Sequence, residues 1–124
     1  MTDSIVSKLH AQMSLPVICS PMFIVSNPKL VVEQCKSGVI GSMPALNARP
    51  AELLDDWLAE INETLASARQ AEPERKIAPY AINQIIHTSN DRLDHDMGMC
   101  EKHKVPMIIT SLRAPDDVVK QTHQ

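Results

Sequence analysis

The sequence predicts an α/β fold in which four βα units with parallel strands follow a short N-terminal helix. Two observations carry this prediction. Short runs of apolar residues alternate along the chain with longer amphipathic segments, and most residues within these runs are apolar, not only every second one. Strands of this kind are buried on both faces, as in a parallel sheet that is covered by helices.

A sheet of this kind closes in one of two ways, as an open doubly wound sheet or as part of a barrel. A complete barrel needs about 250 residues, and this chain has 124. The last predicted helix is short and carries no stop signal. We therefore expect residues 1–124 to be a single domain, truncated from a larger parent, that forms the N-terminal half of a TIM (β/α)8 barrel.

The first two elements are predicted from apolar spacing. Ile5, Val6 and Leu9 share one side of a helix over residues 4–13. The first strand is the apolar run over residues 15–20, which ends in a Ser-Pro-Met turn. Ligands of α/β proteins are held at such turns, where a strand leads into the loop of a βα unit.

Capping residues define the second βα unit. Asn27 is a favourable N-cap and Pro28 suits the first helical position, so a helix is expected over residues 27–38. Gly38 ends this helix. The short strand over residues 39–42 follows at once.

The middle of the chain is dominated by one long amphipathic helix. A loop over residues 43–49 leads to this helix, which is expected over residues 50–69. Its apolar stripe has helical spacing and consists of Leu53, Leu54, Trp57, Leu58, Ile61, Leu65 and Ala68. Its acidic residues face water and are Glu52, Asp55, Asp56, Glu60 and Glu63. A charged linker over residues 70–76 separates the helix from a strand over residues 77–83.

The last two units repeat the pattern. Residues 89–91 open a helix whose apolar positions follow the spacing i, i+4, i+7, at Leu93, Met97 and Cys100. A strand is expected over residues 105–111. A final helix begins at Pro115 and carries Asp116 and Asp117 in its first turn, where acidic groups are favourable.

Composition excludes several classes of partner. The formal net charge is −3 and no basic block is present, which argues against nucleic acid and anionic membranes. No apolar run approaches the ~18 residues of a membrane span. The N-terminus lacks the apolar core of a signal peptide. We therefore expect a cytoplasmic protein.

The three cysteines are odd in number and far apart in sequence. Cys19, Cys35 and Cys100 all fall within predicted strands or on apolar helix faces. We expect them to be buried free thiols rather than partners in disulfides.

The turn Ser20-Pro21-Met22 is the strongest candidate for a ligand site. Pro21 lacks an N–H and fixes the backbone. The turn could simply end a strand, with the Met22 side chain packed. Alternatively it could be a backbone platform whose Met22 N–H is free to approach a flat ligand.

Polar residues end the other predicted strands. Asn83 could bond neighbouring backbone or present its carboxamide to a ligand, because an unpaired amide is costly to bury. Thr110 and Ser111 could bond backbone or offer hydroxyls to the same cavity. Asn47 is expected to form a turn. His87 could reach the same cavity and act in catalysis, but a lone histidine in a loop is more often exposed or bonded to backbone, and we expect that here.

No metal site and no nucleophile-base pair is predicted. On one helix Cys100 and His103 share a face, but His95 lies about 180° from Cys100, so the three cannot converge on a zinc ion. The sequence contains no glycine-rich phosphate motif and only three glycines.

Five ordered segments resemble the nitronate monooxygenases, formerly called 2-nitropropane dioxygenases. The segments are residues 16–23 (PVICSPMF), 35–42 (CKSGVIGS), 44–49 (PALNAR), 81–87 (AINQIIH) and 109–112 (ITSL). No single segment is decisive. Their common order, each at or near a strand end, makes a strong combined signal over nearly the whole chain.

This resemblance implies an FMN-dependent (β/α)8 barrel that oxidises alkyl nitronates with O2 to a carbonyl compound and nitrite. In such proteins the Pro-Met turn lies against the flavin ring, a role that carries over to Ser20, Pro21 and Met22. The asparagine at the end of the third strand carries over to Asn83. The cofactor supplies the redox chemistry and the protein positions it.

The resemblance also marks what this chain does not contain. The histidine base and the glycine-rich phosphate loops of the family follow the middle of the barrel, beyond residue 124. Neither His87 nor His95 stands at the position of that base, so the catalytic residues are unknown. Arg113 stands where the family usually has glycine.

Two further functions remain open. One is a different FMN-barrel oxidoreductase, such as an enoyl reductase. The other is a non-catalytic half-barrel that associates with itself or with a partner through exposed strand edges. We expect this chain alone to show little or no turnover.

Overall fold

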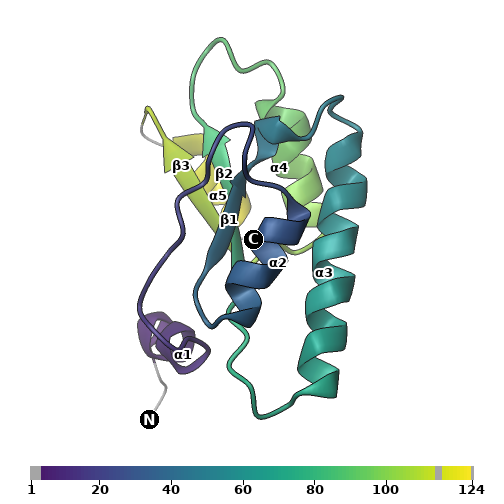
Figure 1. The fold of residues 1–124 in the computed structure, drawn as a ribbon. Coiled ribbons are helices and arrows are strands. Elements are labelled where there is room, and N and C mark those ends of the chain that lie inside the picture. The colour runs from purple at the N-terminus through teal and green to yellow at the C-terminus, as the bar shows by residue number, and fades with distance from the viewer. Residues whose placement is uncertain (1–3, 114–115, 124) are drawn as a thin grey trace.

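The computed structural model describes residues 4–113 and 116–123. A three-stranded parallel sheet with the strand order β1-β2-β3 forms its centre (Figure 1). The strands are β1 (Gly41–Pro44), β2 (Tyr80–Ile85) and β3 (Met107–Ser111). The helices are α1 (Ile5–Ala11), α2 (Pro28–Lys36), the 3-10 helix η1 (Ala45–Asn47), α3 (Leu53–Ala71), α4 (Leu93–Lys102) and α5 (Asp116–Thr122). The α/β class and the parallel sheet are confirmed, and the sheet is compatible with part of a (β/α)8 barrel.

The predicted helices are found in the predicted order, with ends displaced by a few residues. Asn27 is the N-cap of α2, and its side-chain oxygen accepts a hydrogen bond from the Leu30 N–H at 2.9 Å. The final helix is described from Asp116, so the prediction that it begins at Pro115 lies outside the described residues. The loop over residues 43–49 is more ordered than expected, because it contains the last residues of β1 and all of η1.

The first predicted strand, over residues 15–20, is not a strand. It forms a single parallel bridge between Ile18 and Ile40, with hydrogen bonds from the Ile40 N–H to Val17 O and from the Cys19 N–H to Ile40 O. Pro16 within the run and Pro21 just after it have no N–H to donate. Within the described residues, no second neighbour pairs with the outer edge of the run. Four complete βα units are therefore not confirmed.

One face of the sheet carries the main hydrophobic core. α2, α3 and α4 lie together on this face (Figure 1). The stripe predicted for α3 is confirmed, because Leu54, Leu58, Ile61 and Leu65 are fully buried. They pack with Met43 and Ile82 from the strands and with Val31 and Cys35 from α2.

Among the described residues, an apolar cluster covers the opposite face near the amino ends of the strands. A small cluster of Met13, Ile40, Ala78 and Ala81 lies there, with Leu9 of α1 packed against it. The remaining apolar residues of α1 contribute little, because Ile5 is 84% exposed. The carboxyl-end half of this face is lined by the polar strand residues that concern function.

The expectation for the cysteines is correct for two of the three. Cys35 and Cys100 are buried and free, whereas Cys19 is only half-buried, because its segment lies at the open edge of the sheet. Burial raises the pKa of Cys35 to about 11 and the pKa of Cys100 to about 12. These two thiols are therefore protonated near neutral pH and unreactive.

Asp55 joins α3 to the end of α4. Its carboxylate accepts from Lys102 Nζ at 2.9 Å and contacts His103 Nε2 at 2.5 Å. The hydrogen bond from His103 and then that from Lys102 hold the pKa of Asp55 below its usual value. The ionised carboxylate is thus the form that the folded chain favours.

This contact predicts a defined pH dependence. A carboxylate whose pKa is lower in the folded state stabilises the fold above its unfolded pKa of about 3.9, and the contribution disappears as the pH falls through the folded pKa. We expect Asp55→Asn to be less stable than the wild type near neutral pH, and the two proteins to converge below about pH 4. Urea midpoints measured from pH 7 to pH 3 test this, and a difference that persists unchanged at pH 3 contradicts it.

Within the described residues, no helix is long and apolar enough to cross a membrane.

Candidate functional site

Three loops gather at the carboxyl ends of the strands, at the upper end of the sheet in Figure 1. The first loop spans residues 20–27, the second spans residues 45–52 and the third spans residues 86–92. In parallel α/β sheets ligands bind at this end. The predicted site residues Ser20, Pro21 and Met22 lie in the first loop, and Asn83 lies in β2 just before the third.

The Met22 N–H is not free, so of the two alternatives for this turn the open backbone donor is not found. It donates to Ser26 Oγ at 2.8 Å, and the Ser26 N–H donates back to Met22 O at 2.9 Å. Ser26 is buried. The reciprocal pair closes a turn over residues 23–25, so the loop satisfies its own donor. Ser20 is exposed, and the Met22 side chain is 40% exposed.

Asn47 does more than form a turn. Its Nδ2 donates to Met22 O at 3.0 Å and to Ser26 O at 2.8 Å. Its Oδ1 accepts from the Ile24 N–H at 3.2 Å. One side chain of the second loop therefore binds the backbone of the first loop at three points.

The tip of the first loop is apolar, exposed and strained. Ile24 has a φ of 70°, the left-handed region that β-branched residues avoid. Phe23, Ile24 and Val25 are each more than half exposed. The Arg49 guanidinium lies over the Phe23 ring, 5.1 Å from its centroid.

Asn83 lies on the sheet face opposite the helices. In the parallel register it pairs with Pro44 on one side and Ile109 on the other. Its Nδ2 donates to Ile109 O and to Ser111 Oγ, both at 3.0 Å. The Asn83 side-chain oxygen makes no hydrogen bond within the part of the chain that the structure describes. Asn83 thus bonds neighbouring backbone, which was one of the two alternatives for it. Its side-chain oxygen stays available as an acceptor.

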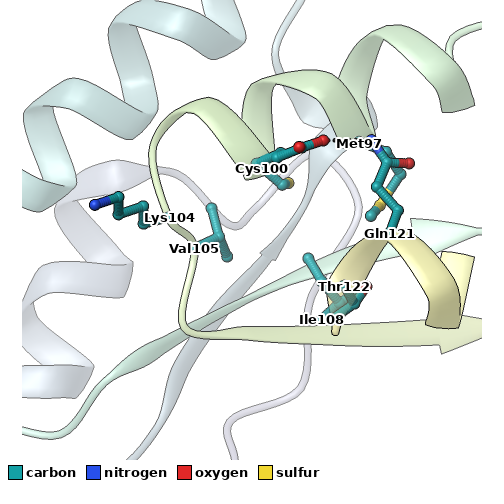
Figure 2. Close-up of a pocket in the computed structure, with 8 residues that line it drawn as sticks. Met97, Cys100, Lys104, Val105, Ile108, Gln121 and Thr122 are labelled. Atoms are coloured by element: carbon teal, nitrogen blue, oxygen red, sulfur yellow. Dashed lines mark hydrogen bonds between the residues drawn. The ribbon is translucent and has the colours of Figure 1, made fainter. Parts of the chain in front are cut away.

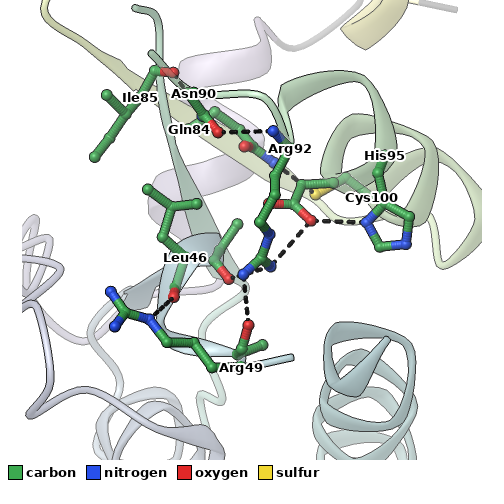
Figure 3. A network of polar contacts seen from close by, with 11 residues as sticks. Leu46, Arg49, Gln84, Ile85, Asn90, Arg92, His95 and Cys100 are labelled. Atoms are coloured by element: carbon green, nitrogen blue, oxygen red, sulfur yellow. Dashed lines mark hydrogen bonds and ion pairs between the residues drawn. The ribbon is translucent and has the colours of Figure 1, made fainter. Parts of the chain in front are cut away.

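Arg92, which forms a partly buried ion pair with Asp96, connects the second and third loops (Figure 3). Arg92 donates from Nη1 to Ala48 O at 2.7 Å and from Nη2 to Ala45 O at 3.2 Å. Its Nη2 also donates to Asp96 Oδ1 at 3.1 Å, and His95 Nδ1 lies 2.9 Å from the same oxygen. Asp96 is fully buried. Sequence reasoning missed this pair; the signal was the i, i+4 spacing of Arg92 and Asp96.

Three buried polar atoms, two of them in this pair and one beside it, have no hydrogen-bond partner within the described residues. They are Gln84 Oε1, Arg92 Nε and Asp96 Oδ2. Gln84 is itself buried between the sheet and α4, where its Nε2 lies 3.5 Å from Cys100 Sγ. The layer between β2 and α4 is therefore polar at its carboxyl end, unlike the apolar core below it.

A cavity beside Cys100 is not part of this site. A cavity of about 390 Å³ is lined by residues of α4, β3 and α5, including Cys100, Ile108 and Gln121 (Figure 2). It lies on the helix-covered side of the sheet, away from the three loops. The protonated Cys100 thiol at its wall offers no nucleophile.

The remaining polar candidates do not join the site. His87 is exposed and bonds Ser89 within its own loop. His103 contacts Asp55 at the C-terminal end of α4. Within residues 4–113 and 116–123, no group of three or more His, Cys, Asp or Glu side chains could hold a metal ion.

A comparison with solved structures gives one clear likeness of fold. Over 99% of its length the chain superposes on a solved structure described as the FabK (M276A) mutant from Thermotoga maritima, with a TM-score of 0.70 and 15% sequence identity. The chain spans 37% of the length of that protein. At this identity the likeness shows the fold alone.

Comparisons of sequence give no further assignment. No protein-family model matches the chain, and no curated protein matches it significantly.

Proposed function

We propose that this chain forms one wall of an FMN site at the carboxyl ends of its strands, in a flavin-dependent oxidoreductase of the barrel class. The observation that carries the proposal is the unpartnered side-chain oxygen of Asn83, held at the end of β2 by Ile109 O and Ser111 Oγ. This oxygen is not among the fully buried unpartnered atoms of the described residues, so it is accessible to a ligand at this end of the sheet. Weaker support comes from the fold likeness to FabK.

The residues present fit the ring of the cofactor and not its phosphate. The carboxamide oxygen of Asn83 is an acceptor suited to a ring N–H, and the exposed side chain of Met22 offers a flat ligand an apolar contact. In place of the Met22 N–H, which Ser26 uses, we propose that the side chains of Pro21 and Met22 and the exposed Ser20 face the ring. None of the three glycines lies in a loop after a strand end. A phosphate site would come from other residues of a longer protein.

The activity proposed for the whole parent protein is the oxidation of alkyl nitronates by O2 to a carbonyl compound and nitrite. This rests on the ordered sequence segments that resemble nitronate monooxygenases. When bound, FMN would supply the redox chemistry. The residues of this chain would bind and orient the ring, and no described residue is proposed as the base. A reductase acting on an enoyl substrate is the alternative within the same class.

Cofactor binding tests the proposal directly. We expect the purified chain to copurify with, or to bind on titration, a flavin that absorbs at about 450 nm. Asn83→Ala should weaken FMN binding about fivefold to tenfold, because one hydrogen bond to the ring is lost. Asn62→Ala is the matched control, since Asn62 bonds Tyr80 and His103 away from the loops. Absence of FMN binding in the wild-type chain contradicts the proposal.

A second function is favoured by one specific observation. Leu15, Val17 and Ile18 are 44–60% exposed at one open edge of the sheet, and β3 is the other edge. A second copy of the chain could pair with both edges. A chain that binds no FMN and elutes as a dimer in light-scattering chromatography supports a non-catalytic, self-associating half-barrel instead.

Nitrite release by a longer, FMN-loaded parent would separate oxygenase from reductase.

A further inference from the structure

We infer that Asn47 is a positioning residue that holds the first loop in one pre-formed conformation, and that Arg92 holds the turn that carries Asn47. This inference rests on the proposed function only in one respect, namely that the loop so held is a wall of the cofactor site. The holding itself is a property of the chain and can be measured without any ligand.

The first loop depends on Asn47 for its attachment to the rest of the molecule. Residues 22–26 make two hydrogen bonds among themselves, between Met22 and Ser26. Within the described residues, every hydrogen bond that reaches this segment from elsewhere in the chain comes from Asn47. Both N–H groups and the oxygen of its carboxamide are used. No smaller or single-function side chain could replace all three bonds.

The strained residue of the loop, Ile24, is also the residue whose N–H donates to Asn47. Ile24 is held at a φ of 70°, yet its side chain is 81% exposed, so packing does not impose this conformation. A strained backbone persists only where its surroundings over-determine it. The hydrogen bond from the Ile24 N–H to Asn47 Oδ1 acts directly on the backbone of Ile24 and helps to hold it in this conformation. A loop fixed before binding loses less conformational freedom when a ligand arrives.

Asn47 is itself held from the third loop. Arg92 binds Ala45 O and Ala48 O, the carbonyls that flank the turn containing Asn47. Arg49 of the second loop lies over the Phe23 ring of the first loop and so adds a second link between these two loops. Its Nε donates to Leu46 O at 3.2 Å within the second loop. The three loops therefore form one connected unit at the carboxyl end of the sheet. Figure 3 shows the part of this unit that joins the second and third loops.

Site-resolved amide exchange of the full 124-residue chain tests the inference. In Asn47→Ala, exchange at the Ile24 and Met22 amides should accelerate about tenfold or more relative to the wild type, as expected for loss of the bonds that close the loop. The matched control is Asn62→Ala, which removes two inter-element hydrogen bonds at a distance from the loop. It should leave both amides unchanged. Asn47→Asp keeps an acceptor for the Ile24 N–H but lacks the two donors, and should lie between.

FMN titration of the same proteins separates the inference from the proposed function. Weaker FMN binding by about tenfold in Asn47→Ala, with none in Asn62→Ala, supports both. Selective acceleration of Ile24 exchange in a chain that binds no FMN supports the positioning role and removes the proposed function. Equal exchange at Ile24 in the wild type and in Asn47→Ala overturns the inference, whatever the FMN result.

Discussion

Arg92→Ala is expected to lower the free energy of unfolding by about 3–5 kcal/mol, the largest effect of any substitution considered for this chain. Asp96 is fully buried and Arg92 is its main partner. Without the guanidinium, the buried Asp96 side chain keeps only His95, the Ala48 carbonyl loses its donor, and the Ala45 carbonyl keeps only the Ala48 N–H. A buried charge left without its partner costs more than the intact pair contributes. Urea denaturation followed by circular dichroism measures the loss.

The control for this prediction is another arginine in an ion pair. Arg75 pairs with Glu72 at 2.8 Å, but both side chains are about half exposed. Arg75→Ala should change stability by less than about 1 kcal/mol. The double variant Arg92→Met with Asp96→Leu should be more stable than Arg92→Ala, because it removes both buried charges. An Arg92→Ala protein within about 1 kcal/mol of the wild type contradicts the assignment of this pair as a structural tie.

Gly41→Ala is expected to lower the free energy of unfolding by about 1–3 kcal/mol. A Cβ at Gly41 would lie 2.5 Å from the backbone oxygen of Val31 and 3.1 Å from Cys35 Sγ. The contact is with backbone, so a rotamer change cannot relieve it. Glycine here lets α2 approach β1 closely. Differential scanning calorimetry or urea denaturation measures the cost.

Gly98→Ala is a control that makes the same substitution as Gly41→Ala but is expected to change stability in the opposite direction. It lies within α4, and a Cβ there would meet no atom within 4 Å. Gly98→Ala should therefore raise stability by about 0.5–1 kcal/mol, because alanine loses less conformational entropy in a helix. If both alanine variants destabilise the chain equally, close packing at Gly41 is not the cause of its effect.

The helices were predictable because their signals are local. The stripe of Leu54, Leu58, Ile61 and Leu65 has the spacing of one helix face, and the Asn27-Pro28 pair marks a helix start. The run over residues 15–20 has an equally clear apolar pattern, but the strand predicted there does not form. A strand needs a neighbour at the right register, and this run finds only Ile40.

The places of the polar candidate residues at the strand ends were predictable, but their contacts were not. A polar residue at the end of a strand pointed to Asn83, and its carboxamide does lie at the carboxyl end of the sheet. A free Met22 N–H stayed open as one of two alternatives, because nothing in the local pattern links it to Ser26. Asn47 was expected to serve only its own turn, because its partners are 21 to 25 residues away in sequence.

The sequence by itself determined the α/β class, the order of the helices and the parallel strands, and the location of the polar residues at the strand ends. These follow from periodicity and capping, which act over a few residues. Only the tertiary structure decided that Asn47 and Arg92 tie three loops together, and that the first strand is reduced to a bridge. Hydrogen bonds between distant segments and the pairing of strand edges depend on which segments meet in space, and no local pattern records this.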